Sequence, residues 1–340
     1  MLAEYVFTGA CFLAGILAVG CFPEKLKTPC SGNPAHTFTM NSTPQWSAAA
    51  ARELLELACK ALGVDYQRLE LIRFGTNAIY RLQPLKLVAR VTRPGAPWEW
   101  TLREMAITQW LSERGFPTIP PDLSIHPEPF AIYDSTVTFW PWFQQADRPV
   151  SQNEFGMLLH DLHQTTNLYP GALPPWEPML IVDTLLEHIK KSQSVAGADI
   201  ELLRRWRYWI DNQLHDHPSE LGDGVIHGDA HVGNCLNSID GPILFDFDYV
   251  CRGPREWDLI PATLGPRRFG RPREEYDQFA EGYGHDVIYW PGYRISALAR
   301  ELLITCWRLD VESISQVRTE GETRLRYWRR GANPPGWRSF

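Results

Sequence analysis

The stretch "VIHGDAHVGNCLNSIDGPILFDFDYV", residues 225–250, decides how the rest of the chain is interpreted. Two apolar runs enclose a set of polar side chains that can carry chemistry: His227, Asp229, His231, Asn234, Asp246 and Asp248. The His-x-Asp-x-His pattern at its start suggests a cage for zinc or iron, which imidazole ligands suit. The carboxylates and the amide suit Mg²⁺ better, because Mg²⁺ takes a few oxygen ligands and keeps several of its waters.

The apolar runs on either side of these residues are typical of short strands. "GVIHGD" and "PILFDFDY" would each bring a carboxylate to the end of an anchored strand, and "AHVGN" would form a tight loop between them. "CLNSIDG" predicts a strand and a turn closed at Asp240–Gly241. Asp229 and Asn234 should therefore share one loop, and Asp246 should lie across the hairpin from them.

In-line phosphoryl transfer needs this order of residue types. One carboxylate accepts the proton of an attacking hydroxyl, while a second carboxylate and an amide oxygen hold Mg²⁺ against the phosphates. Asp229, Asn234 and Asp246 supply these groups in that order. A metal-dependent phosphoesterase, one alternative, would need clusters of His and Asp recurring at several strand ends. The other histidines stand in no such context.

The remaining sequence predicts two lobes, which the length of 340 residues also favours. A helix is expected over residues 47–63, then three short β-forming runs, an amphipathic helix over 99–115 and two further strands. Beyond residue 145 the pattern is mostly helical. The predicted fold class is α+β, with a small antiparallel β-sheet lobe and a larger, mainly helical lobe. The expected bounds are 1–45 for an apolar or disordered extension, 46–143 for the first lobe and 144–340 for the second.

Charge and cysteine content narrow the class of protein. A formal net charge of −7 argues against a general nucleic-acid binder. The seven cysteines form no Cys-x-x-Cys pair, and their odd number and scattered positions fit a reducing compartment better than a disulfide framework.

"HGDAHVGN" followed by "LFDFD" resembles the catalytic loop and metal-binding aspartate of the aminoglycoside phosphotransferase and choline-kinase-like family. "GPREWDLI", with Asp258, matches the family's aspartate beyond the metal site, and a looser resemblance extends over residues 67–310. The resemblance to this family implies a protein-kinase-like two-lobe fold. Nucleotide binding would lie in the first lobe, and catalysis and substrate binding in the second. ATP and Mg²⁺ are the implied cofactors. The implied reaction transfers the γ-phosphate to a hydroxyl of an aminoglycoside-, choline- or sugar-like molecule.

The resemblance also implies roles for single residues of the loop. Asp229 resembles the catalytic base, Asn234 the secondary metal ligand and Asp246 the principal Mg²⁺ ligand. His227 would orient the loop through hydrogen bonds, and Asp258 would brace it. His231 is interpreted as a loop residue near the substrate or solvent.

"RFGTNAIYRL" occupies the place of the family's phosphate-covering hairpin. It has one glycine, Gly75, so Thr76, Asn77 and Ala78 would present backbone N–H groups to the phosphates, and Gly75, Thr76 and Asn77 are predicted to bind the cofactor.

Arg90 in "LVARVTRP" stands where kinases of this fold carry a lysine, and its guanidinium could still hold two phosphates. Glu104 would pair with it, although a surface ion pair on a helix face is an alternative. Adenine would bond to backbone near Phe139 and Trp140, where Pro141 offers no N–H; packing of the tryptophans is the alternative. Because of Arg90, a catalytically weak nucleotide-binding pseudokinase stays open as a second hypothesis.

The first forty residues raise a separate question. "VFTGACFLAGILAVGCF", residues 6–22, is apolar and long enough for a membrane span, yet Glu4 and no basic residue precedes it. A membrane anchor, a cleaved signal and an extension upstream of a true start at Met40 are three interpretations. The last is favoured because the chemistry needs cytosolic ATP. We therefore expect a cytoplasmic protein, which contacts a membrane only if residues 6–22 are retained as an anchor.

The acceptor is not specified by the sequence. Acidic residues at Glu256, Glu274, Glu275 and Asp277 could attract a cationic molecule, while the arginines between residues 318 and 330 argue the other way. The expected partner is a small hydroxyl substrate and not a nucleic acid, and the expected state is a monomer or dimer.

Overall fold

The computed structural model describes residues 46–315 and 320–332. The predicted extension over 1–45, with the apolar segment 6–22, lies outside the described residues. The chain divides into two compact units, a smaller one of residues 46–102 and 121–142 and a larger one of residues 103–120 and 143 onward. The assignment of nucleotide binding to residues 46–143 and of catalysis to 144–340 stays a prediction.

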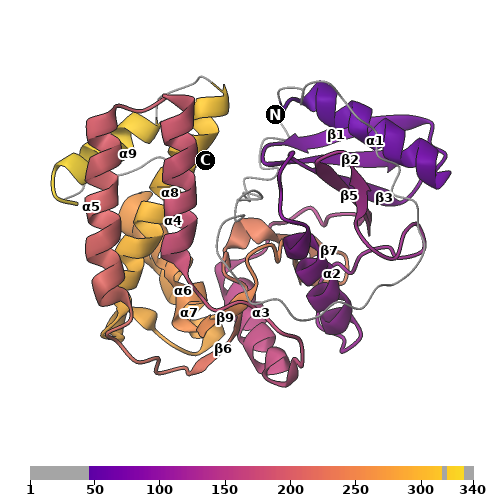
Figure 1. Ribbon diagram of the computed structural model, residues 1–340. Coiled ribbons are helices and arrows are strands. Elements are labelled where there is room, and N and C mark those ends of the chain that lie inside the picture. The colour runs from indigo at the N-terminus through magenta and orange to yellow at the C-terminus, as the bar shows by residue number, and fades with distance from the viewer. Residues whose placement is uncertain (1–45, 316–319, 333–340) are drawn as a thin grey trace, which may run out of the picture. The chain divides into compact units, whose positions relative to one another are not determined.

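The smaller unit contains the helix α1, the first residues of α2 (Trp98–Ser112) and a five-stranded antiparallel sheet with strand order β1-β2-β3-β5-β4. Its elements are α1 (Ala48–Leu62), β1 (Arg68–Phe74), β2 (Asn77–Gln83), β3 (Leu87–Thr92), β4 (Phe130–Ile132) and β5 (Ser135–Pro141). In Figure 1 the helix α1 lies along the sheet. The sheet supplies the hairpin between β1 and β2, the central strand β3 and its neighbour β5, the three places in this sheet where nucleotide-binding residues were predicted.

The helix α1 forms because its apolar residues recur at helical spacing between two capping residues. Ala51, Leu54, Leu55 and Ala58 are buried and belong to one core with the sheet. Ser47 accepts a hydrogen bond from the backbone N–H of Ala50 at 3.2 Å, which caps the first turn. The helix ends at Gly63, which takes the left-handed conformation at φ 68°.

The larger unit is mainly helical. It contains the end of α2 (Trp98–Ser112), the helices α3 (Gln152–Thr165), α4 (Pro178–Ser192), α5 (Gly197–Leu214), α6 (Glu256–Arg268), α7 (Arg273–Tyr283), α8 (Tyr293–Ser315) and α9 (Glu320–Arg329), and the short helices η1 (Thr166–Leu168), η2 (Val232–Asn234) and η3 (Val287–Tyr289). Two antiparallel strand pairs join them: β6 (Asp223–Ile226) with β9 (Cys251–Pro254), and β7 (Cys235–Ser238) with β8 (Gly241–Leu244). A small antiparallel sheet in one unit and helices in the other confirm the predicted fold class.

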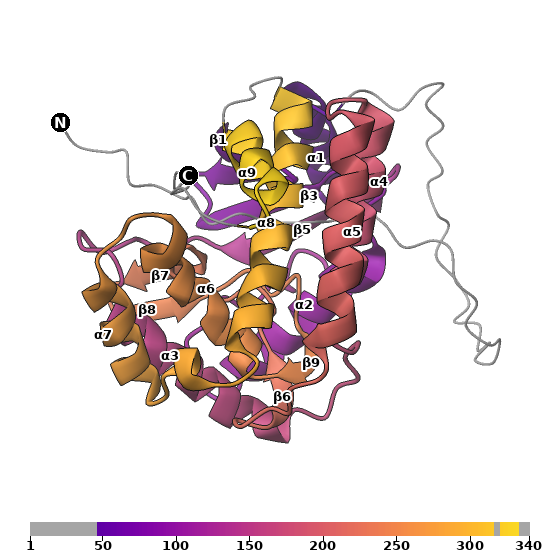
Figure 2. The same ribbon diagram turned by 90° about the vertical axis from the view of Figure 1, so that its left-hand side faces the viewer.

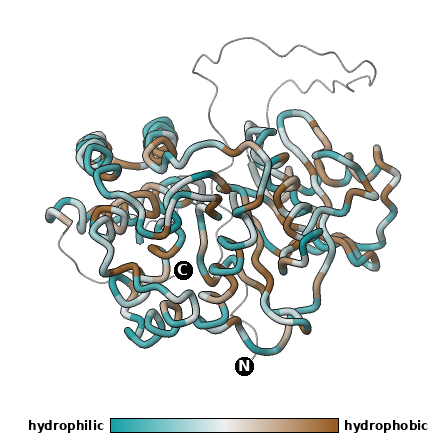
Figure 3. Tube along the Cα trace, turned by 90° about the horizontal axis from the view of Figure 1, so that it is seen from below, coloured by the Kyte–Doolittle hydropathy of each residue, from teal (hydrophilic) through white to brown (hydrophobic). Residues whose placement is uncertain are grey.

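The helices of the larger unit pack in two groups, which Figure 2 shows: α4, α5 and α8 run side by side, and α3 lies against α7. The second contact is close because both helices carry a glycine there. A Cβ at Gly156 would lie 2.3 Å from the carbonyl oxygen of Phe279, and one at Gly282 would lie 2.1 Å from that of Asn153. In Figure 3 the apolar segments of the helices alternate with polar ones, as expected for helices that bury one face.

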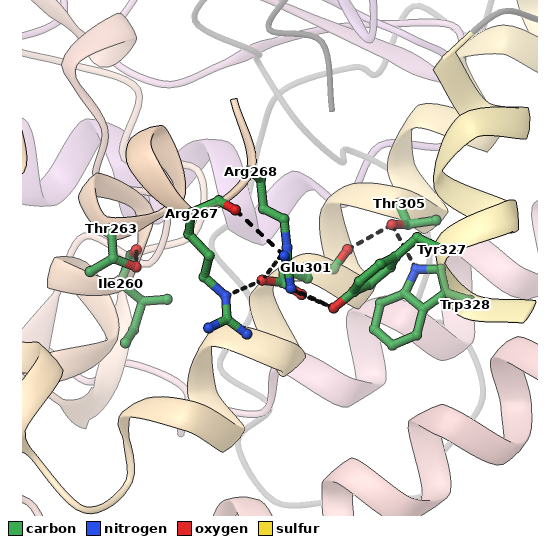
Figure 4. Close-up of polar contacts among 8 residues, drawn as sticks. All are labelled: Ile260, Thr263, Arg267, Arg268, Glu301, Thr305, Tyr327 and Trp328. Atoms are coloured by element: carbon green, nitrogen blue, oxygen red, sulfur yellow. Dashed lines mark hydrogen bonds and ion pairs between the residues drawn. The ribbon is translucent and has the colours of Figure 1, made fainter. Parts of the chain in front are cut away.

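A buried polar cluster joins three helices of the larger unit (Figure 4). Glu301 of α8 is fully buried and accepts hydrogen bonds from Arg267 at 2.6 Å and from Arg268 at 2.8 and 2.9 Å, both on α6. Tyr327 of α9 donates to Glu301 at 2.5 Å and accepts from Arg268 at 2.6 Å. One carboxylate therefore fixes α6 and α9 against α8.

No helix in the described part of the chain is both long and apolar enough to cross a membrane.

The Glu301 cluster leads to a stability prediction. Glu301→Gln removes this counter-charge from the buried guanidinium of Arg268 and from the partly buried one of Arg267, so we expect the free energy of unfolding to fall by about 3–5 kcal/mol. Urea unfolding measures this loss. The control is Glu56→Gln, which removes the exposed i,i+4 pair with Arg52 and should cost less than about 0.5 kcal/mol. Equal losses in the two variants would show that the cluster does not hold the helices together.

Candidate active site

Residues 225–250 fold into a loop, a hairpin and a second loop within the larger unit. Strand β6 ends at Ile226, and His227 to His231 lead into η2. The strands β7 and β8 then form the predicted hairpin, with Cys235 opposite Leu244 and Ser238 opposite Gly241. Phe245 begins the second loop, and its N–H donates to the carbonyl of Asn234 at 3.0 Å. The hairpin thus brings the residue before Asp246 next to Asn234.

The two loops approach each other closely at Gly228. This residue has φ +83°, and a Cβ on it would lie 2.3 Å from the carbonyl oxygen of Tyr249. Only glycine fits both the left-handed backbone and the contact. The glycine in His-Gly-Asp is therefore required by the neighbouring loop.

His227 is fully buried between the two loops, and both of its ring nitrogens face protein groups. Nε2 lies 3.0 Å from the carbonyl oxygen of Phe245, and Nδ1 lies 3.3 Å from the backbone N–H of Asp229. These contacts require a proton on Nε2 and a lone pair on Nδ1, which is a neutral imidazole. Burial lowers the pKa of His227 below its ordinary value of 6.5, in agreement with that form. The ring connects the loops and has no nitrogen left for a metal.

Asp258, in the first turn of α6, holds the backbone of the same loop. Its carboxylate accepts the N–H of His227 at 2.7 Å and the N–H of Gly228 at 2.9 Å. His163 of α3 approaches it through Nε2 at 3.0 Å, while its Nδ1 lies 2.8 Å from the hydroxyl of Tyr283 of α7. Burial raises the pKa of Tyr283, so its hydroxyl keeps its proton. The contact between α3 and α7 is thus linked to the loop through a buried chain of hydrogen bonds.

Asp229 is buried, and its two carboxylate oxygens have different neighbours. Oδ1 accepts a hydrogen bond from the guanidinium of Arg300 on α8. Oδ2 lies 3.7 Å from Nε2 of His231. His231 caps η2, because its Nδ1 accepts the N–H of Gly233 at 3.1 Å.

Asn234 is fully buried beside this carboxylate. Its Nδ2 donates to the carbonyl of Asp229 at 3.0 Å, which fixes the direction of the amide. Its Oδ1 has no hydrogen-bond partner among the residues that the structure describes. A buried amide oxygen of this kind is suited to a ligand such as a cation.

Three carboxylates meet close to the second loop. One oxygen each of Glu104, Asp246 and Asp248 lie within 4.8 Å of one another, and all three residues are buried. Asp246 has φ 71°, a left-handed conformation that non-glycine residues adopt at a cost. Carboxylates at this spacing repel one another, and a divalent cation with oxygen ligands would remove that repulsion. The donor set fits a hard divalent ion.

The predicted phosphate-covering hairpin is the connection between β1 and β2 in the smaller unit. The N–H of Gly75 donates to the carbonyl of Asn77 at 3.0 Å, and its carbonyl accepts from the indole of Trp46 at 2.7 Å. Thr76 accepts the N–H of Arg93 at 3.2 Å. The turn is thus held by backbone bonds within its own unit.

Arg90 is a buried residue of β3. Its Cζ lies 5.6 Å from the ring centre of Trp140 on the neighbouring strand β5, an arrangement that allows a cation–π contact. Glu104 belongs to the larger unit, where it meets Asp246 and Asp248. The pairing of Arg90 with Glu104 stays a prediction.

The backbone at the predicted adenine site is partly engaged. The carbonyl of Phe139 accepts the N–H of Asp122 at 2.8 Å, and the N–H of Trp142 donates to Lys86 at 2.9 Å. The indole N–H of Trp140 donates to the hydroxyl oxygen of Thr138 at 2.9 Å. Binding of adenine at Phe139 and Trp140 stays a prediction, and these bonds limit the groups that could serve it.

Sequence reasoning missed Arg300, His163 and the position of Glu104 beside the two aspartates. Arg300 stands in the helical run "ALARELL", where nothing distinguishes it from a solvated arginine. The sequence indicated only weakly that Asp248 lies near the site, because two aspartates in "DFD" end one apolar run.

Several solved structures share this fold. An amicoumacin kinase in complex with AMP-PNP, Ca²⁺ and Ami matches with a TM-score of 0.64 at 18% identity, over 82% of this chain and 92% of that one. A choline kinase from Streptococcus pneumoniae matches with a TM-score of 0.59 at 16% identity, over 83% and 98%. An aminoglycoside phosphotransferase from Streptomyces rimosus gives 0.53 at 16%, over 74% and 98%. These identities establish the fold alone, which is that of the protein-kinase-like small-molecule kinases.

Sequence comparison gives the family. The phosphotransferase enzyme family matches residues 72–295, which is more than half of the chain. The chain therefore belongs to the phosphotransferase enzyme family, as its loop motif predicted. An uncharacterized protein of Synechocystis sp. is 28% identical over 171 residues, 47% of this chain and 46% of that protein. The match spans about half the length of this curated relative.

His227 leads to a prediction about pH. Because its pKa is lowered in the folded protein, the unfolded chain takes up a proton below pH 6.5 that the folded chain does not. Stability from this residue is present above pH 6.5 and is lost as the pH falls. His227→Gln should make the dependence of unfolding free energy on pH shallower there, by up to about 1.4 kcal/mol per pH unit.

Urea unfolding at a series of pH values measures that slope. The control is Met157→Gln on the exposed side of α3, which changes no ionisable group, so the slope should stay as in the unsubstituted protein. A slope that His227→Gln does not change would mean that His227 is protonated in the folded protein.

Proposed function

We propose that this protein is an ATP-dependent small-molecule kinase that transfers the γ-phosphate to a hydroxyl of its acceptor. The observation that carries the proposal is the convergence of Asp229, Asn234 and Asp246 on one loop-and-hairpin segment, with all three side chains buried. The order and chemistry of these groups match the needs of in-line phosphoryl transfer. Membership of the phosphotransferase enzyme family supports it independently.

Asp229 is proposed as the group that receives the proton. The acceptor oxygen forms a bond to the γ-phosphorus while the bond to the leaving ADP breaks, and the hydroxyl proton passes to the carboxylate. Oδ2 is the oxygen proposed for this step, since Oδ1 is bonded to Arg300. Asn234 fixes the backbone carbonyl of the same residue and so limits movement of the base.

Asp246 and Asn234 are proposed to hold Mg²⁺, with Asp246 as the principal ligand. Two observations support a divalent ion here: Oδ1 of Asn234 has no hydrogen-bond partner within the described part of the chain, and oxygens of Glu104, Asp246 and Asp248 lie close together. Mg²⁺ bound there would offset the negative charge of the β- and γ-phosphates. Asp248 and Glu104 would contribute negative charge close to the ion. The related amicoumacin kinase was solved with a nucleotide analogue and Ca²⁺.

The smaller unit is proposed to hold the nucleotide. Thr76 and Asn77 would offer backbone N–H groups to phosphate oxygens at the β1–β2 turn. Arg90 would bind two phosphate oxygens through its planar guanidinium, and Trp140 would hold that group in place.

The acceptor is proposed to be a hydroxyl-bearing aminoglycoside-, choline- or sugar-like molecule. Among the acidic residues that could attract a cation, Glu256 is fully buried and binds Ser219, Glu220 and Leu221 at 2.6–2.8 Å. Glu275 and Asp277 pair with Arg271 and Arg273 along α7. These contacts make Glu256, Glu275 and Asp277 less suited to binding a cationic group of the acceptor. The need for ATP further supports a cytoplasmic location.

Turnover of a single acceptor tests the proposal. The full chain is screened against aminoglycosides, amino alcohols, sugars and nucleosides with ATP and Mg²⁺, and release of ADP is coupled to an absorbance change. Asp229→Asn should lower kcat by about 1,000-fold, because a positioned base is lost, while Mg-ATP still binds. Asp246→Ala should abolish the Mg²⁺-dependent part of nucleotide binding.

Asp161→Asn, an equal change of charge on the exposed side of α3, is the matched control and should leave turnover unchanged. Full activity in Asp229→Asn would rule out its role as base. Nucleotide binding without turnover of any acceptor would instead favour the pseudokinase.

A further inference from the structure

Arg300 contacts the proposed base more directly than any residue of the loop motif does. It lies on α8, 71 positions along the chain from Asp229, and its guanidinium donates to Oδ1 of that carboxylate. A second nitrogen of the same group lies 3.3 Å from the carbonyl oxygen of Gly228. Both partners of the ion pair are buried.

The hydrogen bond from Arg300 makes the two carboxylate oxygens of Asp229 unequal. A free carboxylate rotates about its Cβ–Cγ bond, so either oxygen could face the acceptor. With Oδ1 bonded to Arg300, rotation would break a buried charge-assisted hydrogen bond. Oδ2 is left as the oxygen for the acceptor, on the side of His231.

Arg300 is itself held on several sides. Its Cζ lies 5.8 Å from the ring centre of Trp257, and the indole N–H of Trp257 donates at 3.0 Å to the same Gly228 carbonyl. The next residue of α8, Glu301, is fixed by Arg267 and Arg268 of α6. The guanidinium therefore meets the loop from a helix whose position is set elsewhere.

We propose that Arg300 is a positioning residue, which orients the carboxylate of Asp229 and compensates its buried charge so that Oδ2 faces the acceptor hydroxyl. This rests on the proposed function insofar as Asp229 is the base. The competing explanation is an ion pair that stabilises the fold and has no influence on the reaction. The two differ in what happens to kcat when a guanidinium is lost and then returned from solution.

The kinetic test uses Arg300→Met, with Arg300→Lys as a second variant that keeps the charge but lacks the planar fork. We expect kcat to fall about 100-fold in Arg300→Met, as for a misplaced catalytic group, with KM for ATP within about twofold. Arg300→Lys should recover part of kcat. Added guanidinium or methylguanidinium should raise kcat of Arg300→Met saturably.

The matched control is Arg207→Met, which removes a partly buried arginine from ion pairs with Asp183 of α4 and Asp211 of α5 that do not touch Asp229. Its kcat per folded molecule should be unchanged, and guanidinium should not increase it. If Arg300→Met keeps its kcat, or if Arg207→Met responds to guanidinium equally, Arg300 does not position the base.

A second measurement needs no turnover and separates this inference from the proposed function. Urea midpoints are compared for Arg300→Met, Asp229→Asn and the double variant. Removing Arg300 should lower the midpoint less than about half as much in the Asp229→Asn background, because no carboxylate is then left uncompensated. Additive shifts would show that the pair does not interact and would overturn the inference. Failure of the unsubstituted protein to phosphorylate any acceptor would overturn the proposed function. The comparison of urea midpoints would still show whether Arg300 and Asp229 interact.

Discussion

The carboxylate of Asp258 is the constraint on which the active-site loop depends. It accepts the backbone N–H groups of His227 and Gly228, which lie in a buried loop beyond the end of β6. Buried N–H groups outside a strand ladder need such an acceptor, or the loop would not stay in the interior. Because Asp258 stands in the first turn of α6, its negative charge also lies at the favourable end of that helix. The loop thus takes its place from α6.

Helix α6 also supports the side chain of the proposed base, through its contact with α8. Arg267 and Arg268 of α6 bind Glu301 of α8, and the preceding residue of α8 is Arg300. Asp258 therefore holds the backbone of the His-Gly-Asp segment, while α8 holds the side chain of Asp229. A displacement of α6 against α8 would move these two supports relative to each other. This explains why Arg268 and Glu301 are buried there, with Arg267 partly buried beside them, at a desolvation cost that apolar residues would not carry.

Sequence analysis predicted the features that depend on local order. The hairpin with its turn at Asp240–Gly241, the antiparallel sheet lobe and the shared loop of Asp229 and Asn234 all follow from strand, turn and loop signals within a few residues. Arg300 and His163 could not be predicted, because only helix packing brings them to the loop, and their local context is that of any amphipathic helix. The position of Glu104 beside Asp246 was missed for the same reason.

The two halves of the candidate site differ in the charges that the fold brings together. On the side of the base, Arg300 compensates the charge of Asp229, and Asn234 binds its carbonyl. On the other side, three buried carboxylates lie within 4.8 Å of one another, and Asp246 holds a left-handed backbone conformation. Like charges so close together repel one another, and a divalent cation bound to their oxygens would weaken that repulsion. The proposed base therefore has an arginine as its counter-charge, whereas the three clustered carboxylates form a donor set that suits a hard divalent ion.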